Sequence, residues 1–187
     1  MLNFSEIFDY PIYVVGGAVR DQILNLPVKD IDLASALRPK EFIALCDKLK
    51  LKTYPTGIKH GTVSVRIKGE LYEHTTFRRD VSCDGRNASI SFSDTIEEDL
   101  SRRDFTMNAI ALLGDGYIDP YNGREDLKKG LIRSVGDASE RFREDYLRIV
   151  RAARFAARLG FDYHPEISLA AKEHFSGILK HVSFERI

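Results

Sequence analysis

The sequence has few cysteines and no long apolar stretch. Cys46 and Cys83 are the only cysteines, and no apolar run is long enough to span a bilayer or to form the core of a secretory signal. A lone pair of cysteines is typical of a protein kept in a reducing compartment. These absences predict a reduced, cytoplasmic protein that is not bound to a membrane.

The chain also has no net charge, since 28 Lys and Arg residues balance 28 Asp and Glu residues. This balance excludes an overall basic surface, although a local basic patch could still bind nucleic acid. From Arg124 onward there are thirteen basic and ten acidic side chains, so a mild basic excess falls in the last third. At 187 residues the chain is long enough for one domain, with or without an appended helical piece.

Residues 13–35 carry the most informative pattern in the chain. An apolar, β-branched run at 13–15 predicts a short strand, and Gly16 and Gly17 predict a turn that exposes backbone N–H groups. Residues 19–26 predict a short helix that Pro27 ends. Such a turn can bind a phosphate, although a glycine pair after a strand is more often only a turn.

Two aspartates follow on a second predicted strand, at residues 30–33. Because strand side chains alternate, Asp30 and Asp32 are expected on one face, with Ile31 and Leu33 in the core. Paired carboxylates offer the hard oxygen ligands that Mg²⁺ prefers. Alternating aspartates alone are more often a solvated face, but a phosphate-binding turn followed closely by a carboxylate pair is a rarer arrangement.

The motif G-G-x-V-R-D at residues 16–21, followed by D-I-D, resembles the start of the class II nucleotidyltransferases of the DNA polymerase β superfamily. That family includes tRNA CCA-adding enzymes and bacterial poly(A) polymerases. The resemblance implies an α+β fold with two parts. A polymerase β-like catalytic head, a small mixed sheet with flanking helices, is expected over residues 1–136, followed by an all-α neck over residues 137–187.

Two further helices are predicted in the first fifty residues. Phe4 and Phe8 have helical spacing, which predicts a short helix that packs on the core. Pro39 stands in the first turn of a second helix, whose apolar face includes Phe42 and Cys46. Cys46 is therefore expected to be a small core residue.

Residues 62–67 and 71–77 alternate like two half-buried strands around a turn at 68–70, which predicts a β-hairpin beside the aspartate strand. Glu73 is out of character in the second strand. It is either an edge-strand charge or, by resemblance to the family's acid-bearing strand, a third metal carboxylate. His60 is expected to be structural or close to the substrate, because Mg²⁺ prefers oxygen.

Residues 78–94 are polar, contain glycine and lack periodicity, so they are predicted to form a mobile loop over the site. Similar loops in CCA-adding enzymes take part in nucleotide addition. That resemblance implies working charges at Arg79, Asp80 and Arg86. A solvated surface loop is the alternative.

Residues 95–113 return to helical character and contain the run R-R-D-F-T-x-N-A from Arg102 onward, which matches a family motif. Arginine forks can bind triphosphate oxygens in bidentate fashion, and an Asp or Asn can bind ribose hydroxyls. An Arg-Arg-Asp run that arises by chance is usually a surface salt-bridge cluster. Here six matched positions in register favour the family motif.

Residues 117–127 predict a strand, a turn and a short helix, and they resemble the family's D-P-x-x-G-x-x-D-L segment. Asp119 is expected to form an Asx-type turn, and Gly123 to occupy a positive-φ position. Both residues are therefore expected to be mainly structural.

From residue 137 the pattern is helical. One helix is predicted to begin at Arg143, to run to about Leu159 and to end at Gly160. Its apolar face is expected to include Ile149, Val150, Ala153 and Ala157.

This helix contains E-D-x-x-R and R-x-x-R-F-A-A-x-L-G-F, which resemble the family's neck motifs. Asp145 and Arg148 are three residues apart and are expected on the same side of the helix. The resemblance implies that this pair reads the base edge of the incoming nucleotide. Acids in a first helical turn can also do no more than complement the helix dipole.

The resemblance as a whole implies three sets of site residues. The catalytic set is Asp30, Asp32 and Glu73; the metal ligands are Asp30 and Asp32; the nucleotide-binding set is Gly16, Gly17, Arg20, Arg103, Asp104, Asn108, Asp145, Arg148, Arg151 and Arg154.

The expected activity is addition of CMP, AMP or both from CTP and ATP to the 3′ end of tRNA, by two-metal-ion catalysis with Mg²⁺ and release of pyrophosphate. The stretch G-I-K-H-G-T-V-S-V is similar to the CCA-adding form, and no G-R-R-F-type segment of bacterial poly(A) polymerases is found. The alternatives are a poly(A) polymerase and a non-catalytic nucleotide- or RNA-binding fragment.

Ser183 is predicted to begin a helix close to the last residue of the sequence. Relatives continue at the matching point into helical body and tail regions. The chain is therefore expected to be the head and neck of a larger enzyme. Weak tRNA affinity is expected unless a second chain or a C-terminal body and tail region completes it.

Overall fold

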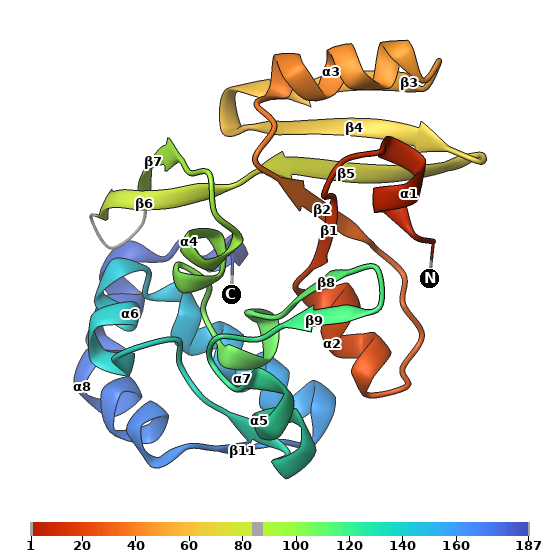
Figure 1. The fold of residues 1–187 in the computed structure, drawn as a ribbon. Helices are drawn as coiled ribbons and strands as arrows, with labels where there is room; N and C mark the ends of the chain where they lie inside the picture. Colours follow the sequence, from red (N-terminus) through yellow and green to blue (C-terminus); the bar gives the residue numbers. More distant parts are fainter. Residues whose placement is uncertain (1, 84–87, 187) are drawn as a thin grey trace.

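The structure of the protein is a computed structural model that describes residues 2–83 and 88–186, the side chains of residues 80–90 excepted. It contains a seven-stranded sheet in the order β3-β4-β5-β2-β1-β8-β9 (Figure 1). The strands β2 and β5 are parallel, and the other neighbours are antiparallel. The strands are β1 Tyr13–Val15, β2 Asp32–Ser35, β3 Lys52–Gly57, β4 Thr62–Ile67, β5 Glu70–Thr76, β8 Ala111–Leu113 and β9 Gly116–Ile118.

Three helices accompany this sheet: α1 (Phe4–Phe8), α2 (Gly17–Ile23) and α3 (Pro39–Lys48). Phe42 of α3 and Phe8 of α1 are fully buried, with ring centroids 5.4 Å apart, and each contributes about 2–3 kcal/mol to folding through burial. The helices expected near residues 4–8 and 39–49 and the hairpin of β4 and β5 are confirmed. The strand β3 was not predicted, because its side chains do not alternate between apolar and polar residues.

The loop expected at residues 78–94 is wrong, because this segment forms a two-stranded antiparallel sheet of β6 (Arg78–Cys83) and β7 (Ala88–Phe92). Its strands are held by cross-strand backbone pairing between mostly polar residues, which leaves little hydrophobic periodicity to detect. Arg79 lies on β6. Arg86 and the side chain of Asp80 lie outside the described residues.

Residues 95–113 are helical only at α4 (Ile96–Ser101), followed by a 3₁₀ turn at Thr106–Asn108 before β8. The chain leaves the helix because Phe105 forms a β-bridge with Ser134, and the Asp104 side chain accepts a hydrogen bond from the Phe105 N–H. The continuous helix expected here is therefore wrong.

The C-terminal part contains α6 (Ala138–Glu144), α7 (Leu147–Leu159) and α8 (Pro165–His181), which Figure 1 shows at the far end of the molecule from α3. Two short strands, β10 (Leu131–Ile132) and β11 (Asp162–Tyr163), pair in parallel and tie this part to the head. The expected all-α neck is therefore wrong in one detail, the strand β11. The division at residues 136 and 137 remains a prediction.

The single helix predicted from Arg143 is two helices, because Asp145 has an extended backbone (φ −151°, ψ 106°) that ends α6. Gly160 ends α7 in the left-handed conformation (φ 68°), as predicted. The buried residues of α7 are Ile149, Ala152 and Phe155. Ile149 is therefore confirmed on the apolar face and Val150 packs partly buried against the core, whereas Ala153 and Ala157 are exposed, so their placement on that face was wrong.

The turn before α5 (Gly123–Lys129) corrects one glycine prediction. The positive φ belongs to Asn122 (56°) and not to Gly123. A Cβ on Gly123 would collide with the backbone carbonyl of Thr106, so glycine is required there for close packing. Asp119 accepts hydrogen bonds from the N–H groups of Gly123 (2.7 Å) and Arg124 (2.9 Å), which confirms its structural role.

Within the described residues, no helix is long and apolar enough to cross a membrane.

Candidate functional site

A cavity of about 730 Å³ lies between the head sheet and α7. Strands β1, β2, β4 and β5 contribute one wall, and α4 and α7 contribute residues to the other. Of the thirteen predicted site residues, all but Asp30 line this cavity: Gly16, Gly17, Arg20, Asp32, Glu73, Arg103, Asp104, Asn108, Asp145, Arg148, Arg151 and Arg154. Segments far apart in the sequence therefore converge on one site.

The sheet side of the cavity is acidic. Asp32 begins β2 and is in direct register with Glu73 on the parallel strand β5, so the two carboxylates are cross-strand neighbours. Burial raises the pKa of Asp32; the nearby Arg103 lowers it, and Glu73 and Asp30 raise it further. The Asp30 charge is near enough to Asp32 to raise its pKa. Asp30 was expected within the strand, but this was wrong, because β2 begins at Asp32.

These carboxylates do not form a ready-made cage for a metal ion. Among the described residues, no three His, Cys, Asp or Glu side chains are grouped closely enough to hold one. The three acids Asp30, Asp32 and Glu73 are also absent from the ion pairs of the described side chains. Mg²⁺ often uses only one or two carboxylates and completes its octahedron with water and substrate phosphates. The acidic wall fits that kind of site.

The glycine turn supports the opposite wall. Gly16 has φ 71°, and its N–H donates to the Ile110 carbonyl at 3.3 Å. A Cβ on Gly16 would lie 2.7 Å from Arg103 Nη1, so the glycine leaves the room in which the Arg103 guanidinium lies. Gly17, the first residue of α2, also lines the cavity.

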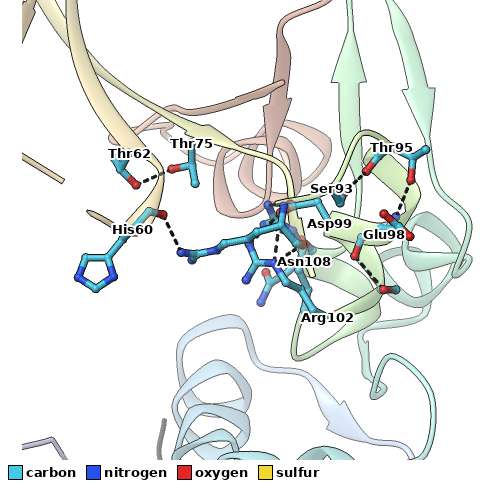
Figure 2. A network of polar contacts seen from close by, with 12 residues as sticks. His60, Thr62, Thr75, Ser93, Thr95, Glu98, Asp99, Arg102 and Asn108 are labelled. Carbon is cyan, nitrogen blue, oxygen red and sulfur yellow. Dashed lines mark hydrogen bonds and ion pairs between the residues drawn. The ribbon is translucent and has the colours of Figure 1, made fainter. Parts of the chain in front are cut away.

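One carboxylate orients two arginines on this wall, and sequence reasoning missed it. Asp99 on α4 is 2% exposed and accepts from Arg102 Nη2 at 2.9 Å and from Arg103 Nη2 at 2.9 Å. Asp99 Oδ1 also accepts from the backbone N–H of Arg78, where β6 begins. Figure 2 shows Asp99 and Arg102 side by side within a polar network that also includes Asn108.

Burial acts to raise the pKa of Asp99, but the guanidiniums of Arg103 and Arg102 outweigh it and hold that pKa below its usual range. Asp99 is therefore a carboxylate that stays charged and fixes both arginines. The signal in the sequence was an acid three and four residues before two arginines on a predicted helix, a spacing that favours ion pairs.

A second polar chain crosses from α2 to α7. The buried Arg20 donates to Asn108 Oδ1 at 2.7 Å, and Asn108 Nδ2 donates to Asp104 Oδ1 at 3.1 Å. Asp104 Oδ2 accepts from Arg151 at 2.7–2.8 Å. Arg20 also forms an ion pair with Asp21 at 2.7 Å, so its side chain is fixed in place and supports this wall of the cavity.

The break between α6 and α7 forms a corner of the cavity. The carboxylate of Asp145 accepts from the N–H of Leu147 at 3.0 Å and begins α7. Arg148 donates to Glu144 Oε2 at 2.8 Å and to the backbone carbonyl of Arg102 at 3.1 Å. Asp145 and Arg148, the pair predicted to read the base, therefore both line the cavity. Arg148 is fixed by Glu144 from the neck and by Arg102 from the head.

Residues 12–133 match the family described as the poly A polymerase head domain. The chain belongs to that family. The predicted resemblance to class II nucleotidyltransferases is therefore confirmed, together with the mixed sheet and flanking helices of the head.

Relatives from this family align with nearly the whole chain. The CCA-adding enzyme of Limosilactobacillus fermentum is 46% identical over the full chain, and that of Geobacillus stearothermophilus is 46% identical over 95% of it. The crystal structure of the Bacillus stearothermophilus CCA-adding enzyme in complex with CTP aligns over 98% of the chain with a TM-score of 0.86 and 43% identity.

A tRNA nucleotidyltransferase complexed with a primer tRNA and an incoming ATP analog also shares the fold, with a TM-score of 0.78 and 30% identity over 98% of the chain. In each comparison the match covers only part of the relative. The chain spans 46% and 44% of the two curated relatives, and 45% and 52% of the two solved chains.

Proposed function

We propose that the chain is the catalytic head and the adjoining neck of an RNA nucleotidyltransferase that adds CMP, AMP or both to the 3′ end of tRNA, with pyrophosphate as the product. The observation that carries this proposal is the cavity itself. It has carboxylates without ion-pair partners among the described side chains on one wall, and a set of ion-paired arginines on the other. Such a site suits a nucleoside triphosphate, which is anionic and needs its charge neutralised at the reacting phosphate.

The relatives support the choice of substrates. Proteins named CCA-adding enzymes, one of them in complex with CTP, match nearly the whole chain, and a tRNA nucleotidyltransferase was solved with primer tRNA and an ATP analog. CTP, ATP and a tRNA 3′ end are therefore the proposed substrates. A larger protein that includes a body and tail region is the proposed context, since the matched relatives are about twice as long.

The acidic wall is the proposed metal site. Asp30 and Asp32 would hold Mg²⁺, with Glu73 beside them, because their oxygens are hard ligands and none is tied up in an ion pair among the described side chains. Ions bound there would lower the pKa of the terminal ribose hydroxyl and offset the charge of the departing pyrophosphate. Burial is the largest cause of the raised pKa of Asp32, and the like charges of Glu73 and Asp30 add to it; a cation would relieve that repulsion.

The remaining residues bind and orient the nucleotide. Arg103, fixed by Asp99, faces the glycine turn and is placed for triphosphate oxygens. Asp104 and Asn108 are placed for ribose hydroxyls. Asp145 and Arg148 offer an acceptor and a donor fork, which can pair with the polar edges of cytosine and adenine and leave uracil and guanine badly matched.

A poly(A) polymerase is the second candidate function, since the family description includes that activity. Incubation with labelled CTP or ATP, Mg²⁺ and tRNA that lacks its terminal nucleotides separates the possibilities. CCA addition requires CTP incorporation that precedes a single AMP, whereas poly(A) synthesis extends with ATP alone. No incorporation of either nucleotide, in the chain or in a longer protein that contains it, would contradict both and favour a binding fragment.

A further inference from the structure

The acidic wall continues across the sheet in one row. Asp32 is in register with Glu73, Glu73 with Ser64 on β4, and Ser64 with Tyr54 on β3. Residues in direct register point to the same face of a sheet. Tyr54 therefore lies on the face that carries the candidate catalytic acids. At ~4.8 Å per strand it lies three strands, or about 14 Å, from Asp32.

Two cations lie next to Tyr54 on this face, both on the same side of it along the strands. Lys52 Nζ lies 5.3 Å and Arg66 Cζ 6.0 Å from the centre of the Tyr54 ring, and Lys52 and Arg66 are themselves in register on β3 and β4. Arg66 donates to the Gly69 carbonyl at 2.8 Å, which holds its guanidinium at this edge. The Arg66 side chain beside Tyr54 lowers the pKa of the tyrosine hydroxyl.

This pair of cations has no acidic partner among the described side chains. Neither Lys52 nor Arg66 takes part in an ion pair there, although both are exposed. Like charges directly opposite on neighbouring strands are destabilising, so the arrangement favours an anion between them. The exposed Lys50 and Lys68 stand at the adjoining strand ends and extend the positive charge.

We propose that Lys52, Tyr54 and Arg66 bind the RNA substrate a few nucleotides upstream of its 3′ end. A phosphate is held between the two cations, and a base lies against the tyrosine ring. This inference rests on the proposed function, because it takes the 3′ end to be at Asp32 and Glu73. The span of about 14 Å corresponds to about four stacked nucleotides at ~3.4 Å each.

The test uses single-stranded RNA of two and of eight nucleotides as acceptors, with labelled CTP and Mg²⁺. The double variant Lys52→Ala/Arg66→Ala is expected to raise the KM for the eight-nucleotide RNA about five- to tenfold, and to leave the KM for CTP and for the two-nucleotide RNA unchanged. Because this variant removes the cations that neutralise one phosphate, the slope of log affinity against log salt should become shallower by about 0.7. Tyr54→Ala should weaken binding of the longer RNA, whereas Tyr54→Phe should retain it.

Fluorescence anisotropy with labelled eight-nucleotide RNA measures the same binding without any turnover. The matched control is Lys128→Ala/Lys129→Ala, which removes two charges from the last turn of α5, at a distance from β3 and β4 in Figure 1. Thermal unfolding checks that each variant is folded.

An unchanged KM and salt slope in the β3–β4 variant would overturn the inference, as would an equal loss in the α5 control or an equal effect on both RNA lengths. The proposed function fails separately, because it is contradicted only if the wild-type protein adds no nucleotide.

Discussion

The two walls of the cavity hold their charges in opposite ways. On the sheet wall, Asp32 and Glu73 are cross-strand neighbours without ion-pair partners among the described side chains. On the helical wall, to which α4 and α7 contribute, the arginines are fixed by carboxylates: Arg103 by Asp99, and Arg151 by Asp104. The acids are left available to a cation that is not part of the chain, whereas the arginines are oriented before any nucleotide arrives.

This difference would allow a chain with no net charge to bind the proposed triphosphate. The acids behind the arginines are buried and serve as internal counter-ions, so the exposed edges of the guanidiniums face the cavity. Holding the arginines in place reduces the entropy lost when a triphosphate binds. The following changes, ordered from the largest expected effect to the smallest, test each wall in turn.

Asp32→Ala is expected to lower nucleotide addition at least ~1,000-fold, a loss of about 4 kcal/mol in transition-state stabilisation, because a metal ligand is removed. Asp30→Ala should act in the same direction, and Glu73→Gln less strongly. CTP incorporation under single-turnover conditions measures the loss, and circular dichroism checks the fold. The exposed turn residue Asp115 provides the control, Asp115→Ala. Retained transfer in Asp32→Ala would refute the metal assignment.

Asp99→Asn tests the helical wall. Removal of this buried charge leaves two guanidiniums without their partner, so the free energy of unfolding should fall by about 3 kcal/mol and the KM for CTP should rise about tenfold. Urea unfolding and initial-rate kinetics measure the two effects. Glu98→Gln is the matched control, since the adjacent Glu98 is only partly buried and its Oε1 lies 3.7 Å from Arg79 Nη1. Wild-type KM in Asp99→Asn would show that the arginines are positioned without it.

His74 tests the support behind the acidic wall. It is fully buried beside Glu73, stacks on Phe42 at 3.7 Å and shares a hydrogen bond of 2.8 Å with Ser35 Oγ. Burial lowers the pKa of His74 from 6.5 to about 3. Between these pH values the unfolded chain binds more protons than the folded one, so the stability falls as the pH falls from about 6.5 toward 3.

His74 should therefore account for about 2 kcal/mol of the stability lost between pH 7 and pH 5. Urea unfolding of the metal-free protein at both pH values measures this loss. His74→Gln should reduce the loss by that amount, whatever its own stability at pH 7. His60→Gln, which changes an exposed histidine, should leave the loss unchanged. An identical loss in His74→Gln would show that His74 does not titrate on unfolding.

Arg148→Ala tests base selection at the corner between α6 and α7. We expect the ratio of kcat/KM for CTP over UTP to fall about tenfold, close to 1.4 kcal/mol, with a smaller change in triphosphate affinity. Asp145→Ala should act alike. Glu144→Gln, which removes the ion pairs of Glu144 with Arg148 (2.8 Å) and Arg141 (2.9 Å), should have a weaker effect in the same direction. Unchanged selectivity in both Asp145→Ala and Arg148→Ala would return the pair to helix capping.

The parts of the molecule that local patterns determine were predictable. The alternation of residues 62–67 identified β4, and Gly160 marked the end of α7. Motif spacing also selected residues that share one cavity, although nothing in the local sequence brings Gly16 near Arg103. The resemblance supplied that long-range information, because a family motif records a folded arrangement.

The errors arise where tertiary contacts override local preference. The helical signal across residues 143–159 is continuous, yet the helix breaks at Asp145, where Arg148 bonds to the Arg102 carbonyl in the head. The β6–β7 hairpin is held by backbone pairs that leave no apolar period. Asp99 was missed because its function lies in its partners, which only the folded chain brings around it.

The close fit of Tyr146 and Gly177 has a mechanical consequence. A Cβ on Gly177 would collide with the Tyr146 ring, so this ring occupies a notch in α8, and it also stacks on His181 at 4.9 Å. Tyr146 stands directly between Asp145 and Leu147, at the joint between α6 and α7. A displacement of α8 at Gly177 would therefore meet the Tyr146 ring, which stands in the joint between Asp145 and Arg148.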